Sequence, residues 1–401
     1  MKHFRTIPIV SALSAVLLTV GMLTTINSAG AAGTKIIKVP IAELASQTGA
    51  LAVPSIPAIQ ATQYAVSQIN KTGFKIKGKT YKLALTVKND NSDPATAVQA
   101  TTGLISKHIV AMFGPFGPDA PPVATLTNKA KVLLFDPSSA LAATSGPPSG
   151  AYNFVTSGDP SAIGTTMVAA IKAFVPGAKS VAFLAPNEDP VTSDVTVIQA
   201  AAAKAGLTFY NDIYPFGTTV LSSVLTTMAG QDPSAVIMLD GTSDYQLQAP
   251  QFASSGVPKS VVMLQYGATS STCQTYGLAN GYACIADTVA GVNFSASNLP
   301  ALDSAWLKGF AKYTGKNLAY AISNGSFATY SYDYVFMLVQ AMEKAGTVTN
   351  TTQIANALRG HVVRNGLVGR ITFNSHDLPE FPLFFAYVPL TGPIQNKSFA
   401  P

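Results

Sequence analysis

Residues 109–140 read IVAMFGPFGPDAPPVATLTNKAKVLLFDPSSA, and this stretch indicates the fold. It holds two short apolar runs, 109–113 and 132–135, separated by a Gly- and Pro-rich break and a segment that reads as a helix. Continuous apolar strands joined through a helix are typical of a parallel sheet buried on both faces. Such sheets bind ligands beside the carboxyl ends of their strands. The stretch therefore predicts an α/β fold whose ligand site is formed by the loops after these two runs.

The two loops also predict the kind of group that is bound. Each leads from a strand toward a helix, so free backbone N–H groups and the positive end of a helix dipole face the crevice. This arrangement suits a carboxylate or another anion, with serine hydroxyls as further donors. The candidate ligand-binding residues of the two loops are Phe116, Gly117, Pro118, Asp119, Ser138 and Ser139. The alternatives are that Asp119 and Ser138 only cap helices and that Phe116 only covers the core edge.

The remaining chain predicts a second sheet of the same kind. At 401 residues the chain is too long for one ordinary core, and strands alternate with helices again from residue 161 to residue 264. Extended segments at 152–156, 287–293 and 366–373 are interpreted as crossings between lobes. We therefore expect two discontinuous Rossmann-like lobes joined by a three-segment hinge. The expected parts are a signal peptide (1–31), a first lobe (34–155 and 289–368) and a second lobe (156–288 and 369–401).

The N-terminus has the order of a secretory signal. A basic segment, residues 1–5, precedes an apolar run over 7–26 and a small-residue segment that contains Ala29-Gly30-Ala31. We expect cleavage after Ala31. An uncleaved anchor is the alternative, since the apolar run is about long enough to span a bilayer. Because no Cys lies near the cleavage site, we expect a periplasmic or other extracytoplasmic protein that is not a lipoprotein.

The two cysteines, Cys273 and Cys284, agree with export. They flank a Gly-containing turn region, and in an oxidising compartment we expect them to form a local disulfide. The histidines of the mature chain, His108, His361 and His376, are isolated from one another in sequence. Because a metal site needs several ligands together, we expect no metal and no cofactor.

Charge and motifs argue against binding of nucleic acid or nucleotide. The formal net charge of +6 includes basic residues of the leader, and the other lysines are scattered without an Arg-rich run. Residues 73–80, GFKIKGKT, formally match a phosphate loop. A phosphate loop follows a strand and opens a helix, whereas this segment follows a helix and opens the strand at 81–87. We interpret it as a basic turn.

Several motifs together resemble the type I periplasmic solute-binding proteins of the branched-chain amino acid (leucine/isoleucine/valine) ABC transporter class. They are TGALA at 48–52, AVSQIN at 65–70, KIKGKTYKLALTVKNDNSDPATAV at 75–98, FGPFGPDAPPVA at 113–124, LLFDPSSA at 133–140 and GLVGRITFN at 366–374. The resemblance covers nearly all of the mature chain. It implies an ABC importer whose permease and ATPase subunits are separate chains, to which this protein delivers ligand after lobe closure.

The resemblance also implies where parts of a ligand are held. In amino-acid binders of this family, the loops that match 117–119 and 138–140 hold the ligand carboxylate. The amino group is usually met by an acidic residue after the strand that matches 261–264, and Tyr266 stands there in this chain. Asp240 is the candidate replacement, with a helix-capping role as the alternative. Tyr266 either packs on the ligand or covers the core edge.

Three functions are compatible with these features. The leading hypothesis is a monomeric extracytoplasmic binding protein of an ABC importer, which captures a small organic solute in the inter-lobe cleft. The solute class would be an amino acid or a related carboxylate or amide. A ligand sensor that signals to a membrane partner is the alternative. An enzyme is not expected, because the chain contains no Gly-x-Ser-x-Gly elbow and no His-Glu-x-x-His motif.

Overall fold

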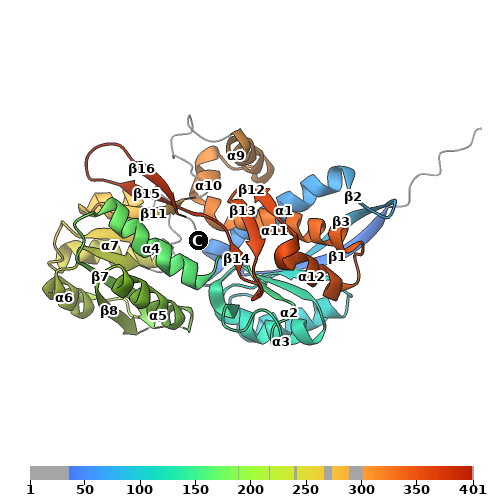
Figure 1. Ribbon diagram of the computed structural model, residues 1–401, viewed down its shortest axis with the longest axis horizontal. Helices are drawn as coiled ribbons and strands as arrows, with labels where there is room; N and C mark the ends of the chain where they lie inside the picture. The colour runs from blue at the N-terminus through green and yellow to red at the C-terminus, as the bar shows by residue number, and fades with distance from the viewer. Residues whose placement is uncertain are drawn as a thin grey trace, which may run out of the picture. The chain divides into compact units, whose positions relative to one another are not determined.

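The structure, a computed structural model, describes residues 36–187, 189–215, 217–238, 242–265, 273–288 and 301–399. The expected signal peptide lies outside these residues. The described chain contains two sheets of mainly parallel strands with helices packed on their faces (Figure 1). The expected α/β fold with two Rossmann-like sheets is confirmed.

The first sheet has six strands in the order β2-β3-β1-β4-β5-β6. Its strands are β1 (Ile37–Leu44), β2 (Phe74–Ile76), β3 (Lys79–Lys88), β4 (Ala111–Phe113), β5 (Leu133–Asp136) and β6 (Asn153–Val155). All neighbours pair in parallel except β2, which forms an antiparallel hairpin with β3. The carboxyl ends of β1, β4, β5 and β6 therefore meet at one edge of the sheet.

Alternation of side chains along these strands explains which helices cover which face. Val39, Ile41 and Phe135 share one core cluster with α1 (Ala52–Thr72), α11 (Gly325–Ala345) and α12 (Thr351–His361). Ala42 and Leu134 point to the opposite face, where they pack against α2 (Pro94–Ile105) and α3 (Ala120–Lys129). The helices that cover the first sheet thus come from both the N-terminal and the C-terminal part of the chain.

The second sheet has seven strands in the order β16-β15-β11-β10-β9-β7-β8. Its strands are β7 (Ser180–Asn187), β8 (Thr208–Pro215), β9 (Ala235–Met238), β10 (Val262–Gln265), β11 (Cys284–Thr288), β15 (Leu383–Val388) and β16 (Gln395–Phe399). The strands from β7 to β11 run parallel, whereas β15 and β16 are antiparallel. The edge of the sheet is β16, which pairs with β15.

Helices cover both faces of this sheet as well. One core cluster joins it to α4 (Pro160–Phe174) and α5 (Asp189–Lys204), and another to α6 (Ser222–Gln231) and α7 (Thr242–Ser254). Two further helices, α9 (Ala301–Thr314) and α10 (Leu318–Ser323), pack with Ala61 of α1 in a small cluster around Trp306 and Phe310.

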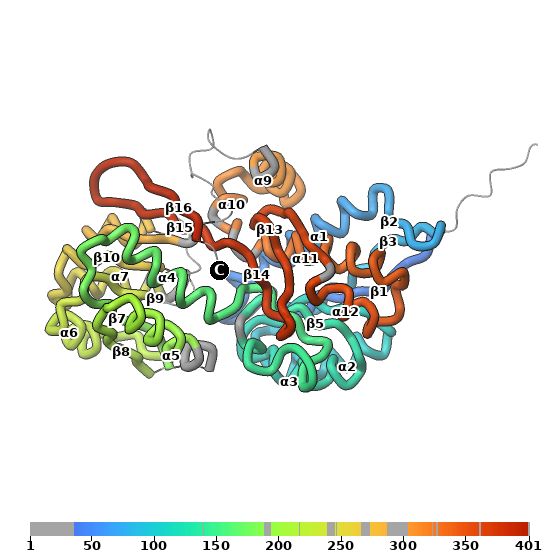
Figure 2. The backbone as a smooth tube through the Cα atoms, viewed as in Figure 1, coloured from blue at the N-terminus to red at the C-terminus, as the bar shows by residue number. Residues whose placement is uncertain are grey.

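A small third sheet changes the expected position of the last crossing. Strands β12 (Arg364–Gly366), β13 (Gly369–Phe373) and β14 (Pro379–Glu380) pair with one another and not with the seven-stranded sheet. The Phe373 ring packs against Phe154 and Tyr334, which belong to β6 and α11. Residues 369–373, expected in the second lobe, therefore lie with elements of the first. The chain reaches the second sheet only after β14, at residues 381–382 (Figure 2).

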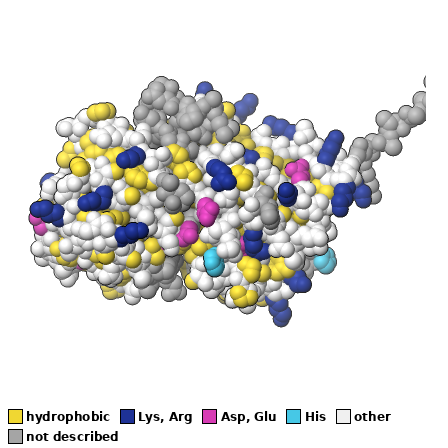
Figure 3. All heavy atoms as spheres, viewed as in Figure 1, with side chains coloured by type: hydrophobic (Ala, Val, Ile, Leu, Met, Phe, Trp, Pro, Cys, Tyr) yellow, Lys and Arg dark blue, Asp and Glu magenta, His cyan; other side chains and the backbone are white. Residues whose placement is uncertain are grey.

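The helix α1 begins at Ala52. Its Pro57 lies inside the helix, beyond the first turn, so one backbone hydrogen bond of the helix is missing there. Among the described residues, no helix is both long and apolar enough to cross a membrane. Lys and Arg side chains are spread over the face shown in Figure 3, in agreement with their scattered sequence positions.

Candidate functional site

The candidate site is the edge of the first sheet where β1, β4, β5 and β6 end. The loops that follow β4 and β5 contain the predicted residues, within two short 3-10 turns, Gly117–Asp119 and Ser139–Leu141. Since parallel strands present their carboxyl ends together, residues far apart in sequence become neighbours here. The prediction that both loops lie at the same edge is confirmed by the pairing of β4 with β5.

Gly114 makes the sharp exit from β4 possible. Its φ of 77° lies in the left-handed region that glycine tolerates, and its amide donates to the Phe135 carbonyl oxygen at 2.8 Å. A Cβ atom at this position would collide with the carbonyl oxygen of Leu44. The chain can therefore turn close against β1 only with glycine here.

A hydrogen-bond bridge joins the two predicted loops. The Gly117 amide donates to Ser138 Oγ at 2.9 Å, and this hydroxyl donates in turn to Asp136 Oδ1 at 2.7 Å. Asp136 also accepts from the amides of Ser138 (2.9 Å) and Leu141 (3.0 Å). The single hydroxyl hydrogen of Ser138 is thus already engaged inside the protein, which leaves its oxygen with acceptor capacity only.

Asp136 lies at the centre of this bridge, and its burial changes the pKa of its carboxyl. Desolvation raises the pKa of its carboxyl to about 7, while the hydrogen bonds from Ser138 and Leu141 oppose the shift. Both the backbone amide and the hydroxyl of Thr156 donate to the Asp136 carbonyl oxygen, at 2.7 and 2.9 Å. Asp136 therefore connects the β5 loop to the segment that leaves β6.

The other residues of the first loop have different surroundings. Phe116 is buried, Gly117 is half-buried and Pro118 is exposed. Asp119 is fully buried at the start of α3, yet neither carboxylate oxygen has a hydrogen-bond partner. It stands at the N-cap position but makes no capping hydrogen bond, so the capping alternative is not seen. Burial, with the nearby charges of Asp90 and Asp93, raises its pKa to about 6.

The remaining predicted residues cannot be placed in the same way. Asp240 and Tyr266 lie outside the described residues, and of Ser139 only the backbone is described. The strand that precedes Tyr266 ends in Gln265, whose side chain is fully buried with both polar atoms lacking a partner. The ligand roles of all these residues stay predictions.

Glu43 is a residue that sequence reasoning missed. It lies next to the last residue of β1, is 2% exposed, and its Oε2 has no hydrogen-bond partner. Burial raises its pKa to about 8, although the neighbouring Thr62 hydroxyl favours the charged form. A signal was present, because Glu43 is the one acidic residue between positions 36 and 89 and interrupts an apolar strand. A strand is predicted from its apolar residues, so a single acidic residue within it is easily overlooked.

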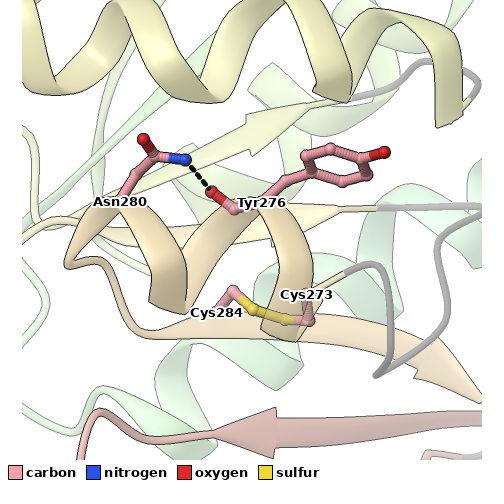
Figure 4. The surroundings of a disulfide bond; sticks show 4 residues. All are labelled: Cys273, Tyr276, Asn280 and Cys284. Carbon is pink, nitrogen blue, oxygen red and sulfur yellow. Dashed lines mark hydrogen bonds between the residues drawn. A yellow bond between two sulfur atoms is a disulfide. The ribbon is translucent and has the colours of Figure 1, made fainter.

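The predicted disulfide between Cys273 and Cys284 is present and lies in the second sheet's helical layer (Figure 4). It joins a single π-helical turn, Cys273–Gly277, to the first residue of β11. The Asn280 side chain donates to the Tyr276 carbonyl oxygen at 2.7 Å and closes the same loop. The Tyr282 hydroxyl donates to the Val257 carbonyl oxygen at 2.8 Å, which ties the loop to the segment that follows α7.

Metal binding has no support in the part of the chain that the structure describes, where no three His, Cys, Asp or Glu side chains gather as ligands. The ion pairs found there, Arg359 with Asp377 and Arg364 with Asp333, hold the third sheet and not the candidate edge.

Comparison with known proteins gives the family. A sequence model described as periplasmic binding protein matches residues 38–389. The chain is similar in structure to a leucine-binding protein of Thermotoga maritima, with 15% identity and a TM-score of 0.74, covering 90% of this chain and 99% of that chain. A branched-chain amino acid transporter substrate-binding protein of Streptococcus pneumoniae, solved with isoleucine, has 18% identity and a TM-score of 0.71, covering 91% and 100%.

A third similar structure carries a different kind of ligand. It is the solute-binding protein of an ABC transporter from R. palustris in complex with benzoate, with 14% identity and a TM-score of 0.70, covering 91% of this chain and 98% of that chain. No curated protein matches significantly. The structural likenesses show the fold, and the sequence model spans both sheets. The chain belongs to the periplasmic binding protein family.

Proposed function

We propose that this protein is the extracytoplasmic solute-binding component of an ABC importer. The observation that carries the proposal is the family match over residues 38–389, which includes every loop of the candidate edge. The similar structures from S. pneumoniae and R. palustris are described as transporter binding proteins, one with isoleucine and one with benzoate. The solute class is thus a small organic molecule such as an amino acid, a related carboxylate or an amide.

The proposed mechanism is capture between two lobes. The first lobe offers the loops after β4 and β5, with Phe116, Gly117, Asp119 and Ser138, held in fixed positions by the Ser138 bridge. The second lobe offers residues after β9 and β10, where Asp240 and Tyr266 stand in sequence. Closure of the lobes around the solute would present a surface that separate permease and ATPase chains recognise. We propose that the protein acts as a monomer.

The first test is a thermal-shift screen of the mature protein against amino acids, amides, aromatic acids and short aliphatic acids. A ligand that binds only the folded state raises the melting temperature by mass action. At least one class should give a concentration-dependent shift, and mass spectrometry should recover that compound unchanged, since we propose no catalysis. Absence of a shift with every class, or conversion of the compound, would contradict the proposal.

The proposed loop anchors have their own test. Replacing Ser138 and Ser139 together by Ala should weaken binding of the identified solute by about 1–3 kcal/mol, because Ser138 positions the Gly117 amide and Ser139 is the hydroxyl proposed to bond the solute. The matched control is Ser106→Ala, whose hydroxyl bonds only the Gly103 carbonyl at the end of α2. Equal affinity in the two variants would remove these hydroxyls from the site.

A further inference from the structure

A small pocket opens beside the predicted loops, and the proposed function does not yet use it. It lies within the first lobe at the strand edge and has room for roughly one water molecule. Its lining residues are Glu43, Ala58, Phe113, Gly114, Phe116, Phe135, Pro137, Thr156, Ser331 and Tyr334. The loops after β4, β5 and β6 all contribute to its wall, so it belongs to the ligand edge.

Two polar groups of the pocket lack hydrogen-bond partners. Glu43 Oε2 and the Tyr334 hydroxyl are both buried without a hydrogen bond. Thr156 Oγ1 gives its only hydrogen to the Asp136 carbonyl oxygen, so it can offer only lone pairs to the pocket. Buried polar groups are normally hydrogen-bonded, because leaving them unpaired costs stability. The pocket therefore contains unused hydrogen-bond acceptors, and it fits a ligand group that brings several hydrogen-bond donors.

The charge around the pocket specifies that group further. The carboxyls of Asp90, Asp119 and Asp136 are buried at the same edge, and none of the described Lys or Arg side chains forms an ion pair with them or with Glu43. An anion placed here would be repelled by every ionised carboxylate nearby. The pocket wall also includes the stacked rings of Phe113 and Phe135, whose centroids lie 4.8 Å apart.

These observations agree on one ligand group. We propose that the pocket is a subsite for a primary ammonium group of the solute, with Glu43 as its counter-ion. An ammonium group is about the size of a water molecule, carries three N–H donors, and is positively charged. Its donors would meet the Glu43 carboxylate and the oxygens of Tyr334 and Thr156. The inference rests on the proposed function and deepens it, because it selects amine-bearing solutes.

Binding of an ammonium group in this pocket should release a proton. Burial raises the pKa of Glu43 to about 8, so at neutral pH the empty pocket holds the neutral acid. When the ammonium enters, the Glu43 proton leaves to solvent and the resulting carboxylate pairs with the cation. About one proton should therefore be released per solute bound at pH 6.5 and almost none at pH 9.

The experiment is isothermal titration of the mature protein in pairs of buffers with different ionisation enthalpies, which counts protons released on binding. The probes are L-leucine and 3-methylbutylamine, with 4-methylpentanoate as the matched compound that lacks the amino group. Asp119 and Asp136 lie at the same edge and have raised pKa values of about 6 and 7. Glu43→Gln is therefore needed to assign the proton, because it keeps the shape of the neutral acid and removes the titration.

The expected result is release of about one proton at pH 6.5 by the amines alone. In Glu43→Gln this release should vanish, and amine affinity should fall about 10-fold or more, as loss of a hydrogen bond to a charged group does. Tyr334→Phe should weaken amine binding by a smaller factor. The control Glu343→Gln, on the exposed end of α11, should behave as the unmodified protein.

Three outcomes separate the subsite from the proposed function. Amine binding without proton release, or with equal affinity in Glu43→Gln and Glu343→Gln, would overturn the subsite. Binding of 4-methylpentanoate or amides while both amines fail would also overturn it and leave the solute-binding function standing. If no compound of the wider screen binds either, the proposed function itself fails.

Discussion

Ser138 Oγ lies 2.9 Å from the Gly117 amide nitrogen and accepts its hydrogen bond, so one hydroxyl joins the loops after β4 and β5. The same hydroxyl donates to Asp136, which is fully buried. The position of the first loop at the ligand edge is thus set by a side chain of the second. This polar bridge fixes the two loops that we propose as ligand anchors.

We expect Ser138→Ala to lower the free energy of unfolding by about 1–2 kcal/mol, because two hydrogen bonds are lost and Asp136 loses a donor. Urea denaturation monitored by circular dichroism measures the change. Ser106→Ala, at an exposed helix end, is the control and should stay within about 0.5 kcal/mol of the unmodified protein. A loss no larger than in this control would mean that the bridge does not stabilise the fold.

Gly114→Ala should be strongly destabilising, by about 3 kcal/mol or more, because the added methyl meets the Leu44 carbonyl oxygen at a left-handed backbone position. Gly103→Ala is the matched control, since Gly103 lies in α2 with open space around it. Alanine favours helix, so this control should gain up to about 1 kcal/mol. Chemical denaturation of both variants decides the question, and similar stabilities would refute the steric argument.

Arg364→Ala should cost about 3–5 kcal/mol, the usual effect of leaving a buried charge without its partner. Asp333 is fully buried on α11 and accepts from Arg364 Nε at 2.9 Å and from the Leu367 amide at 2.6 Å. Burial raises the pKa of Asp333 although Arg364 opposes the shift. The neighbouring Arg370, exposed on β13, provides the control, and Arg370→Ala should change the unfolding free energy little. Comparable losses in the two variants would contradict the role of the pair.

Stability should fall as the pH rises from about 5 to about 8. Glu43, Asp136, Asp119 and Asp377 are buried carboxyls whose pKa values are raised, to about 8, 7, 6 and 6. Because the folded state keeps protons that the unfolded state releases, the stabilisation is complete below the unfolded pKa and is lost as pH rises through each folded pKa.

The measurement for this pH dependence is the melting temperature at intervals between pH 5 and 8.5. Glu43→Gln should flatten the part of the curve between pH 7 and 8, since an amide does not titrate. Glu343→Gln should leave the curve as it is. A melting temperature that rises with pH, or an unchanged curve in Glu43→Gln, would contradict the assignment of a neutral buried Glu43.

Removal of the disulfide by Cys273→Ala together with Cys284→Ala should lower the free energy of unfolding by about 2–4 kcal/mol, since the unfolded chain regains freedom in the closed loop. Ligand preference should not change, because the loop is tied to α7 through the Tyr282 hydroxyl as well. Urea denaturation of the variant beside the oxidised protein tests the first point. Two free thiols in freshly exported protein would show that the bond does not form.

Local patterns predicted much of the fold, and particular residues show why. Asp93 stands before Pro94, an arrangement typical of a helix start, and its carboxylate accepts from the Thr96 amide at 2.7 Å at the beginning of α2. Apolar periodicity located the sheets and their helices because burial leaves a repeating mark on sequence. The start of α1 is poorly marked in the sequence, because the prolines of its first turns indicate a loop when read without the helix around them.

The candidate site was predictable only as a set of loops. Sequence places Gly117 and Ser138 after neighbouring strands, but it does not show that the serine hydroxyl is spent on Gly117 and Asp136. The importance of Glu43 depends on Tyr334, a residue from the far end of the chain that lines the same pocket. Such contacts arise from tertiary packing, so residue type and spacing cannot reveal them.

The late position of α11 in the chain has a consequence for biogenesis. This helix covers α1, and just before it the Tyr320 hydroxyl donates to Gln60, 260 residues earlier. The core around the first sheet stays uncovered until nearly the whole polypeptide has been synthesised. A chain that stays unfolded until its synthesis is nearly complete can be translocated across a membrane. We therefore expect the first lobe to fold only after translocation.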